Sequence, residues 1–494
     1  MTIRLHTPEQ AAGWLRTRVA GNLSCDSRAV GDGDGFIAWP GAATDGRRYV
    51  GDVLAAGATA CLVEALDIDD FGFSDERIAS YCGLKAATAP IAARYFSEPS
   101  KQLQVVAVTG TNGKTSTAWW LAWALSRLGR KCGVVGTLGV GAPDALVPNG
   151  LTTPDPVLLQ QQFRHFADQG FVACAVEASS IGLAEQRLDT TQIRVAMFTN
   201  FTQDHLDYHG SMATYWAAKE MLFGWPGLQA AVINVDDAKG AALNAALMKS
   251  PLDLWTVSVQ GPARIEAHAV QQGMQSLAFE VVEGAERHPV SMSTVGLYNV
   301  SNLLGVVAAM RALGVSLRDA AAAATDLPSV PGRLETLAMP DQPLVAIDYA
   351  HTPDALEKAL LALRSVAHRR GGRLWCVFGC GGDRDATKRP LMAASAQKNA
   401  DHLVVTSDNP RSENPALIIS QILLGLTSGD SVHVQADRAQ AIAETLALAQ
   451  PCDVVLLAGK GHEAYQEVQG VKHPFSDLLH AQAALDARRA GGAS

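Results

Sequence analysis

A glycine-rich turn between an apolar run and a helical pattern carries the residues best suited to chemistry. Residues 103–108 (LQVVAV) predict a buried parallel strand, residues 109–113 (TGTNG) a sharp turn, and Lys114 and Thr115 open a predicted helix that ends near Gly129. Backbone N–H groups and the positive end of the helix dipole favour a phosphate at such a turn. Lys114 can reach a terminal phosphate, and the Thr115 hydroxyl can bind Mg2+. The turn therefore predicts a nucleotide-phosphate site.

The spacing of this turn departs from the usual phosphate-loop pattern G-x-x-x-x-G-K-[ST]. Val108 stands where that pattern has its first glycine, and Gly110 comes two residues later. A plain turn between a strand and a helix is the alternative, because glycine is common in such turns. Gly113, Lys114 and Thr115 at the start of the predicted helix favour the phosphate site, since the mechanism needs them there.

The composition bounds the class of the protein and its partners. A length of 494 residues is typical of about three domains, and 48% hydrophobic with 18% charged residues is ordinary for a globular protein. The net charge of −9 gives no reason to expect a nucleic acid or an anionic membrane as partner. The eight cysteines contain no C-x-x-C pair, no signal-peptide pattern opens the chain, and no apolar run is long enough to span a bilayer. We expect a cytoplasmic protein with reduced thiols.

Three successive α/β units are predicted, over residues 1–97, 98–334 and 335–494. In the second and third units each apolar run ends in a polar or glycine-rich cluster, and ligands bind outside the carboxyl ends of parallel strands. These clusters are therefore expected to converge, in the second unit on the glycine-rich turn and in the third on a second, Rossmann-like crevice. Residues 260–290 alternate in polarity and predict antiparallel strands.

Two clusters of the second unit offer metal ligands. Glu177 follows residues 171–176, and its carboxylate is a candidate ligand for Mg2+, a cation that prefers oxygen. His205 and His209 follow the next predicted strand and would share one face of a helix, a spacing that suggests zinc. The sequence HLDYH lacks the glutamate of the H-E-x-x-H zinc motif. One histidine near Mg2+ is therefore favoured, and a structural role is the alternative for His209.

Polar loops of the first and third units are further candidates. Ser27 and the loop 42–48 could hold a polar ligand, although turn and cap residues are the plainer interpretation. Arg389 and Arg411 of the third unit are natural carboxylate forks. The alternative for residues 408–411 (DNPR) is an Asn-Pro turn into a helix.

Five motifs together resemble the Mur ligase family, whose members join amino acids to the peptidoglycan precursor. They occur in the family's order over nearly the whole chain, as TGTNGKT at 109–115, EASS at 177–180, TN at 199–200 with DHLDYHG at 204–210, YNVSN at 298–302 and DYAHTP at 348–353. The resemblance implies an α/β fold of three domains. These are a small N-terminal UDP-binding domain, a central P-loop ATPase-like domain with a parallel sheet, and a C-terminal Rossmann-like domain for the amino acid.

Residues 408–411 (DNPR) are similar to the signature of those family members that add meso-diaminopimelate to UDP-N-acetylmuramoyl-L-alanyl-D-glutamate. Diaminopimelate differs from lysine by a distal carboxylate, which Arg411 would bind as a fork and which lysine would leave unpaired. The resemblance implies that the γ-phosphate of ATP passes to the substrate carboxylate with Mg2+ bound, and that the incoming amine then attacks the acyl phosphate. A monomer without nucleic acid or membrane insertion is expected.

The resemblance also implies roles for single residues. The catalytic set is Lys114, His205 and Lys219, and Mg2+ would lie near Thr115, Glu177 and His205. Lys219 matches a family lysine that is carbamylated (N6-carboxylysine) to hold a second Mg2+, whereas the sequence alone predicts a surface lysine on a helix. The residues expected to bind ATP are Gly110, Thr111, Asn112, Gly113, Lys114, Thr115, Ser116, Asn299, Arg333 and Asp348.

Two further sets complete the expected sites. The UDP-muramoyl-dipeptide would be held by Cys25, Ser27, the loop Ala42-Ala43-Thr44, Thr152, Thr153, Ser179 and Arg187. Diaminopimelate would be held by Arg389, Asp408, Asn409, Pro410, Arg411, Gly459 and Glu463. Departures from the family pattern concern single contacts: Glu185 replaces a glutamine, Cys25 replaces a leucine, and the loop 42–44 lacks a histidine.

Four alternatives stand beside this interpretation. A ligase of the same kind that uses L-lysine and a folylpolyglutamate-type relative would share most motifs, but Arg411 argues against the first and the N-terminal unit against the second. A nucleotide-binding regulator without catalysis would not need Lys114, Glu177, His205 and Lys219 intact. A nucleotide-sensing scaffold would bind ATP with no turnover.

Overall fold

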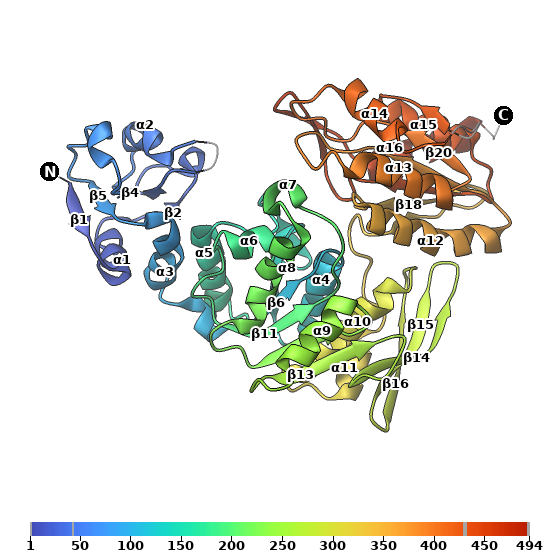
Figure 1. The fold of residues 1–494 in the computed structure, drawn as a ribbon, viewed down its shortest axis with the longest axis horizontal. Helices are drawn as coiled ribbons and strands as arrows, with labels where there is room; N and C mark the ends of the chain where they lie inside the picture. The colour runs from blue at the N-terminus through green and yellow to red at the C-terminus, as the bar shows by residue number, and fades with distance from the viewer. Residues whose placement is uncertain (1, 42–43, 428–431, 492–494) are drawn as a thin grey trace. The chain divides into compact units, whose positions relative to one another are not determined.

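The computed structural model describes residues 2–41, 44–427 and 432–491, whose helices and strands are shown in Figure 1. These residues form three principal sheets and one separate hairpin, which confirms the predicted α/β class. No helix in this described part is long and apolar enough to cross a membrane. The chain divides into two compact units, one of Met1–Thr109, Leu125–Ala196 and Ala218–Ala231 and one of Gly110–Ala124, Met197–Ala217 and Val232–Ser494. The domain boundaries after residues 97 and 334 stay a prediction.

The N-terminal sheet is parallel and apolar on both faces. Its order is β1-β5-β4-β3-β2. Side chains alternate across it, so that Leu62 of β4 lies in one apolar cluster and Cys61 and Val63 lie in the other. Its elements are β1 (Ile3–Leu5), α1 (Pro8–Arg16), β2 (Leu23–Ser24), β3 (Gly35–Ala38), α2 (Val50–Ala55), β4 (Ala60–Glu64), β5 (Ile78–Tyr81) and α3 (Leu84–Tyr95).

The largest sheet has eleven strands among the described residues, in the order β16-β15-β14-β13-β12-β11-β6-β10-β7-β8-β9. The predicted antiparallel strands near its edge are confirmed as β14, β15 and β16. The strands are β6 (Gln104–Thr109), β7 (Cys132–Gly136), β8 (Gly139–Ala142), β9 (Ala145–Val147), β10 (Ala173–Glu177), β11 (Ile193–Phe198), β12 (Ala230–Asn234), β13 (Asp253–Ser258), β14 (Ile265–Gln272), β15 (Leu277–Glu283) and β16 (Glu286–Met292).

The helices that accompany these strands begin where the predicted polar clusters stand. The strand, turn and helix expected at residues 103–129 are confirmed, because β6 ends at Thr109, α4 begins at Lys114, and Gly129 adopts a left-handed φ of 73°. The helices are α4 (Lys114–Arg127), α5 (Pro156–Asp168), α6 (Ser180–Ala184), α7 (Leu206–His209), α8 (Met212–Glu220), α9 (Ala238–Leu247), α10 (Tyr298–Ala312) and α11 (Leu317–Ala324).

The C-terminal sheet has the order β17-β18-β22-β19-β20-β21, and β18, β22, β19 and β20 run parallel. Its elements are β17 (Glu335–Leu337), β18 (Leu344–Asp348), α12 (Pro353–Arg370), β19 (Leu374–Phe378), α13 (Lys388–Asn399), β20 (His402–Val405), α14 (Pro415–Leu423), β21 (Val432–Val434), α15 (Arg438–Leu448), β22 (Val454–Ala458) and α16 (Asp477–Gly491). The loops after the parallel strands therefore leave from one edge of the sheet.

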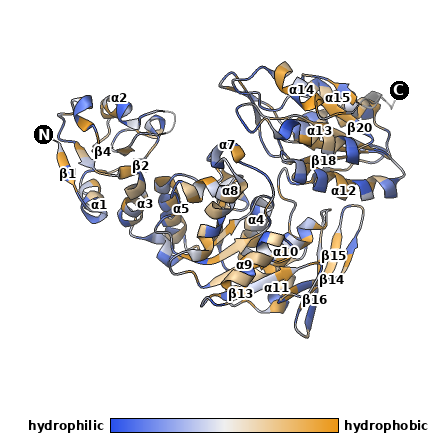
Figure 2. Ribbon diagram, viewed as in Figure 1, coloured by the Kyte–Doolittle hydropathy of each residue, from blue (hydrophilic) through white to orange (hydrophobic). Residues whose placement is uncertain are grey.

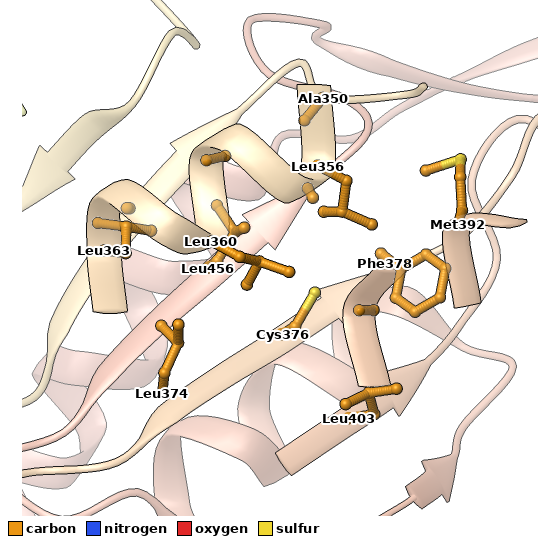
Figure 3. Close-up of a cluster of buried hydrophobic side chains, with 14 of the residues drawn as sticks. Ala350, Leu356, Leu360, Leu363, Leu374, Cys376, Phe378, Met392, Leu403 and Leu456 are labelled. Atoms are coloured by element: carbon orange, nitrogen blue, oxygen red, sulfur yellow. The ribbon is translucent and has the colours of Figure 1, made fainter. Parts of the chain in front are cut away.

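Helix α12 covers one face of this sheet. Its residues Leu356 and Leu360 lie in the same apolar core as Cys376 and Phe378 of β19 (Figure 3). Hydrophilic and hydrophobic residues are mixed along the helix, as expected of an amphipathic helix with one buried side (Figure 2). The hairpin of β23 (Tyr465–Val468) and β24 (Val471–Pro474) follows β22 and is paired only with itself among the described strands.

Candidate active site

The turn after β6 is held by two residues that follow β11. The Asn200 backbone and side chain accept hydrogen bonds from the N–H groups of Thr111 (2.8 Å) and Asn112 (2.9 Å), and the Thr199 hydroxyl donates to the Asn112 carbonyl (2.6 Å). Gly110 has a left-handed φ of 143°, and a Cβ at this position would lie 1.9 Å from the Thr199 hydroxyl oxygen. The turn is thus rigid and needs glycine at this position.

Gly110→Ala is therefore expected to displace the turn. A displacement of about 1 Å near a reacting group can lower the rate roughly a hundredfold, so we expect kcat/KM for ATP to fall by about that factor. Gly129→Ala is the matched control, because Gly129 also has a positive φ (73°) but meets no atom within 4 Å of an added Cβ. The control should lower only the melting temperature. An unchanged kcat/KM for ATP in Gly110→Ala would contradict the requirement for glycine at this position of the turn.

The Lys114 ammonium lies within the turn itself. Its Nζ donates to the carbonyl oxygens of Gly110 (2.9 Å) and Thr111 (2.7 Å). The Thr111 hydroxyl in turn accepts a hydrogen bond from the Tyr215 hydroxyl (3.2 Å). Among the described residues, the Gly113 N–H donates no hydrogen bond. One cation and one backbone donor are therefore gathered at the start of α4, where an anion is favoured.

Three of the residues expected to bind ATP, Thr115, Arg333 and Asp348, lie near one another. Arg333 Nη2 donates to the Thr115 hydroxyl (3.0 Å), and the guanidinium carbon lies 4.4 Å from the centre of the Tyr349 ring. The Asp348 carboxylate accepts a hydrogen bond from the Leu334 N–H (2.7 Å). Burial raises the pKa of Asp348 to about 6, although the Arg333 charge opposes the shift.

Asp348→Asn is expected to change how stability depends on pH. The pKa of Asp348 rises from 3.8 in the unfolded chain to about 6 in the fold, so its stabilising contribution is complete below pH 3.8 and is lost as the pH rises through 6. This shift corresponds to about 3 kcal/mol. The asparagine can still accept the Leu334 N–H but does not ionise. In thermal unfolding from pH 4.5 to 7.5, the melting temperature of the variant should rise relative to wild type. A pH-independent difference would contradict this.

Three further residues expected to bind ATP, Asn299, Ser116 and Asn112, are placed separately. Asn299 Nδ2 donates to the Val295 carbonyl (2.8 Å), and Asn299 Oδ1 accepts from Asn302 Nδ2 (3.3 Å), so this amide is engaged at the start of α10. Ser116 is buried in the first turn of α4. Asn112 Nδ2 donates to the Asp354 carboxylate of α12 (2.9 Å), a partner that sequence reasoning did not single out.

A buried carboxylate lies between two histidines. Asp204 Oδ2 is 3.4 Å from His205 Nε2 and 3.8 Å from His351 Nε2, and Asp204 Oδ1 accepts from the His205 N–H (2.9 Å). Burial opposes ionisation of Asp204, but the charges of His205, His351 and Lys388 lower its pKa to about 2. Burial, with Lys388, lowers the pKa of His351 to about 4. Asp204 and His351 were missed as site residues, although both stand in the quoted motifs.

The zinc alternative gains no support from the described residues, which contain no group of three or more His, Cys, Asp or Glu side chains placed to hold a metal. His209 is buried in α7, and its ring centre lies 5.2 Å from that of Tyr215. This packing agrees with the structural alternative for His209.

Glu177 ends β10 and is held by Thr137. Glu177 Oε1 accepts from the Thr137 N–H (2.8 Å) and Oε2 from the Thr137 hydroxyl (3.2 Å), and only 1% of the residue is exposed. Thr137 follows β7, in a cluster that the sequence pattern indicated without a role. The Glu177 carboxylate is a hard oxygen donor, so its donor chemistry fits Mg2+.

Three of the residues expected at the muramoyl-dipeptide form one hydrogen-bond network with Glu177. The Thr153 hydroxyl donates to the Glu177 carbonyl (2.6 Å) and lies 2.9 Å from the Ser179 hydroxyl, and Arg187 Nη1 donates to the Thr153 carbonyl (2.8 Å). Ser179 also caps α6 through the Gly182 N–H (3.0 Å). The side chains after β10 are therefore fixed relative to the loop that precedes α5.

The remaining residues of this set are placed separately. The Thr152 hydroxyl lies 3.0 Å from that of Thr137. Burial, together with a hydrogen bond to Asp155, raises the pKa of the Cys25 thiol well above its usual value. The Ser27 hydroxyl has no hydrogen-bond partner among the described residues. Ala42 and Ala43 lie outside the described residues, while the Thr44 hydroxyl is 3.4 Å from that of Tyr49.

The expectation of a surface lysine at 219 is wrong, because Lys219 on α8 is only 1% exposed. It lies four residues after the buried Tyr215 and three before the buried Leu222, so helical periodicity could have placed it on the inner face. An ammonium in such a place costs free energy unless it is paired or modified. The burial distinguishes Lys219 from an ordinary helix lysine.

Arg389 already holds a carboxylate of the chain. Its guanidinium is 1% exposed and pairs with Glu413 through Nη1–Oε2 (2.9 Å) and Nη2–Oε1 (2.8 Å). Arg389 also donates to Gln421 Oε1 (2.6 Å) and the Gly381 carbonyl (3.1 Å). The fork expected at Arg389 is therefore filled, and Glu413 is a neighbour that sequence reasoning missed.

Arg411 is held mainly through its backbone. It has a left-handed φ of 52°, its N–H donates to the Glu467 carbonyl (3.0 Å), and its carbonyl accepts from the Gln469 N–H (2.7 Å). Arg411 Nη1 donates to the Gly382 carbonyl (2.6 Å), and 23% of the side chain is exposed. Arg411 Nε also lies 3.7 Å from Glu467 Oε2, so of the two expected forks Arg411 is the one with a partly exposed side chain.

A fully buried lysine joins the two segments expected at diaminopimelate. Lys460 Nζ donates to Asn409 Oδ1 (3.0 Å) and Glu463 Oε2 (3.0 Å), and Asn409 Nδ2 donates to the same Glu463 oxygen (2.8 Å). Lys460 was missed, although it stands between Gly459 and Glu463 in the sequence. Asp408, Asn409, Gly459 and Glu463 are therefore brought together after β20 and β22.

The chain is similar to known proteins over nearly its whole length. The family model described as Mur ligase middle domain matches residues 108–310, and that of the Mur ligase glutamate ligase domain matches residues 332–461. A UDP-N-acetylmuramoyl-L-alanyl-D-glutamate–2,6-diaminopimelate ligase of Acidovorax sp. (strain JS42) is 61% identical, covering 99% of this chain and 98% of that protein. A protein of the same description from Janthinobacterium sp. (strain Marseille) is 47% identical, over 97% of both chains.

Solved structures agree with these relatives. One described as UDP-N-acetylmuramoyl-L-alanyl-D-glutamate–2,6-diaminopimelate ligase has a TM-score of 0.63 at 34% identity and covers 95% of each chain. The MurF ligase from Thermotoga maritima in complex with ADP has a TM-score of 0.69 at 19% identity, over 96% of this chain and 99% of that one, and shows likeness of fold alone. With two domain models matched in sequence order and one relative 61% identical over 99% of this chain, the chain belongs to the Mur ligase family.

Proposed function

We propose that this protein joins meso-diaminopimelate to UDP-N-acetylmuramoyl-L-alanyl-D-glutamate at the expense of ATP, in peptidoglycan synthesis. The observation that carries the proposal is the segment Asp408–Arg411 in a chain 61% identical to a ligase of that description. The segment follows β20, lies beside Glu463 and Lys460, and offers a partly exposed arginine side chain at Arg411. A distal carboxylate distinguishes diaminopimelate from lysine, and an arginine recognises a carboxylate in a bidentate manner.

The reaction proceeds in two steps. The γ-phosphoryl group of ATP is transferred to the free glutamate carboxylate, which releases ADP. An uncharged amine of diaminopimelate then attacks the acyl carbon, the C–N bond forms, inorganic phosphate leaves, and the amine loses one proton. Phosphoryl transfer needs charge neutralisation and alignment more than covalent help. Lys114 supplies a cation at the turn, and Arg333 orients the Thr115 hydroxyl beside it.

Mg2+ would be held near Thr115, Glu177 and His205, and it supplies neutralisation of the phosphate charge when bound. Carbamylation of Lys219 would replace a buried cation by a carboxylate that can hold a second Mg2+. Thr152, Thr153, Ser179 and Arg187 would contact the muramoyl-dipeptide, and Cys25, Ser27 and the loop 42–44 the UDP part. The cytoplasmic location, the monomeric state and the two domain boundaries stay predictions.

Phosphate release tests this function. The protein is incubated with ATP, Mg2+ and UDP-N-acetylmuramoyl-L-alanyl-D-glutamate, and meso-diaminopimelate is compared with L-lysine as acceptor. Turnover with diaminopimelate alone is expected. Turnover with lysine would support a ligase that uses L-lysine as the acceptor. ATP binding without turnover on either acceptor would favour a regulator or a scaffold.

A further inference from the structure

The C-terminal sheet contains an ion pair with no exposed surface, in addition to the residues assigned above. Arg438 opens α15 and Asp477 opens α16, and both side chains are 0% exposed. Arg438 Nε donates to Asp477 Oδ1 and Arg438 Nη2 to Asp477 Oδ2, each at 2.7 Å. This is a bidentate pair of the strongest kind, and it joins the first residues of two helices.

The same guanidinium also holds two strand ends. Arg438 Nη1 donates to the Ser407 carbonyl (3.3 Å), and Arg438 Nη2 donates to the Ala458 carbonyl (3.0 Å). Ser407 directly precedes Asp408, and Ala458 directly precedes Gly459. One buried side chain therefore fixes the backbone immediately before both segments that we propose to bind diaminopimelate.

Stability alone does not account for such a pair. Taking two charges out of water is costly, and a buried ion pair replaced by well-packed apolar residues often leaves stability unchanged or raised. Burial would lower the pKa of Arg438, but Asp477, with further contributions from Asp408 and Glu463, raises it, so the guanidinium stays charged. Its charge is thus coupled to two carboxylates of the pocket as well as to its partner.

We infer that Arg438, anchored by Asp477, is a positioning residue that sets the distance between the segments Asp408–Arg411 and Gly459–Glu463. The inference rests on the proposed function, because it assigns the spacing of those segments to diaminopimelate recognition. The Ser407 and Ala458 carbonyls, at the ends of β20 and β22 on either side of β19, bind one planar group, so the two segments cannot separate without breaking hydrogen bonds to a buried charge. A methionine or leucine at position 438 would fill the space but could not hydrogen-bond the two carbonyls.

The test compares a single variant with a double variant. Arg438→Met leaves the Asp477 carboxylate buried and unpaired, and should lower the melting temperature by roughly 10 °C. Arg438→Met/Asp477→Leu removes both charges and should recover most of that loss. Both variants should raise KM for diaminopimelate roughly tenfold or more, with KM for ATP and for the UDP-muramoyl-dipeptide unchanged. Recovery of KM together with the melting temperature in the double variant would overturn the inference.

A conservative variant keeps the inference testable if the methionine variants do not fold. Arg438→Lys retains the charge opposite Asp477, but a single ammonium lacks the planar fork that reaches both carbonyls. We expect a melting temperature near that of wild type and a KM for diaminopimelate raised about fivefold or more. An unchanged KM in this variant would overturn the inference.

Arg364→Met is the matched control. Arg364 pairs with Asp401 (2.5 Å) and donates to the Asn399 carbonyl (2.8 Å), but these residues precede β20 and lie at the opposite edge of the same sheet. Its KM for diaminopimelate should equal that of wild type. If the wild-type protein fails to turn over diaminopimelate, the proposed function fails. If it succeeds and the Arg438 variants keep its KM, only the present inference fails.

Discussion

Lys114→Met is expected to abolish phosphate release. The Lys114 ammonium lies at the turn after β6, bonded to the Gly110 and Thr111 carbonyls, and methionine removes the charge while it retains an unbranched side chain of similar length. A charge aimed at a transferring phosphoryl group contributes most in the transition state. We expect kcat to fall by about a thousandfold or more. The measurement is phosphate release under saturating substrates.

Lys101→Met serves as the control for this variant. Lys101 is exposed, pairs with Glu98 in the turn Pro99–Gln102, and undergoes the same chemical change away from the glycine-rich turn. Its kcat should match that of wild type. A Lys114→Met protein that keeps more than about a tenth of wild-type kcat would mean that this ammonium does not neutralise the transferring phosphoryl group.

Arg411→Ala is expected to remove discrimination between diaminopimelate and lysine. A hydrogen bond to a charged group contributes about 1.5–3 kcal/mol, so loss of the guanidinium should raise KM for diaminopimelate roughly tenfold to hundredfold. KM for ATP should not change, because Arg333 and the glycine-rich turn are untouched. Any turnover with L-lysine should stay the same or rise, since lysine has no distal carboxylate to lose a partner.

Arg373→Ala provides the comparison for Arg411→Ala. Arg373 is exposed just before β19, at the amino-terminal edge of the same sheet, and lies 3.3 Å from His402. Its removal should leave both KM values unchanged. If Arg411→Ala lowered turnover with diaminopimelate and with L-lysine by the same factor, Arg411 would support the shape of the loop and would not bind the distal carboxylate.

Local patterns were sufficient for the features that depend on neighbours in the sequence. The strand, glycine turn and helix around Lys114 could be predicted because each part has its own signal within 27 residues, from 103 to 129. The antiparallel strands β14, β15 and β16 were predicted from alternation for the same reason. In both of these segments the structure agrees with the prediction from local sequence.

Features that depend on distant partners could not be predicted. Arg389 was predicted to be a carboxylate fork, but its pairing with Glu413, 24 residues later, could not be predicted. The ion pair between Arg438 and Asp477 joins residues that are 39 positions apart in the sequence. A single sequence gives no signal for such pairings, because they arise only when the sheet brings the loops together. Lys219 is a different case. Its spacing of four residues from Tyr215 indicated the buried side of the helix, but a lysine is usually expected on the surface.

The left-handed backbone of Arg411 bears on how this pocket can change in evolution. An arginine in that conformation is less stable than glycine or asparagine by about 1 kcal/mol or more. The conformation is held by the β23–β24 hairpin, where the Glu467 carbonyl accepts from the Arg411 N–H and the Gln469 N–H donates to the Arg411 carbonyl, and not by the side chain of residue 411. The loop would therefore keep its shape when residue 411 is exchanged. A new acceptor preference could therefore arise by a change at this one position, and replacement by glycine or asparagine would also relieve the backbone strain of the arginine.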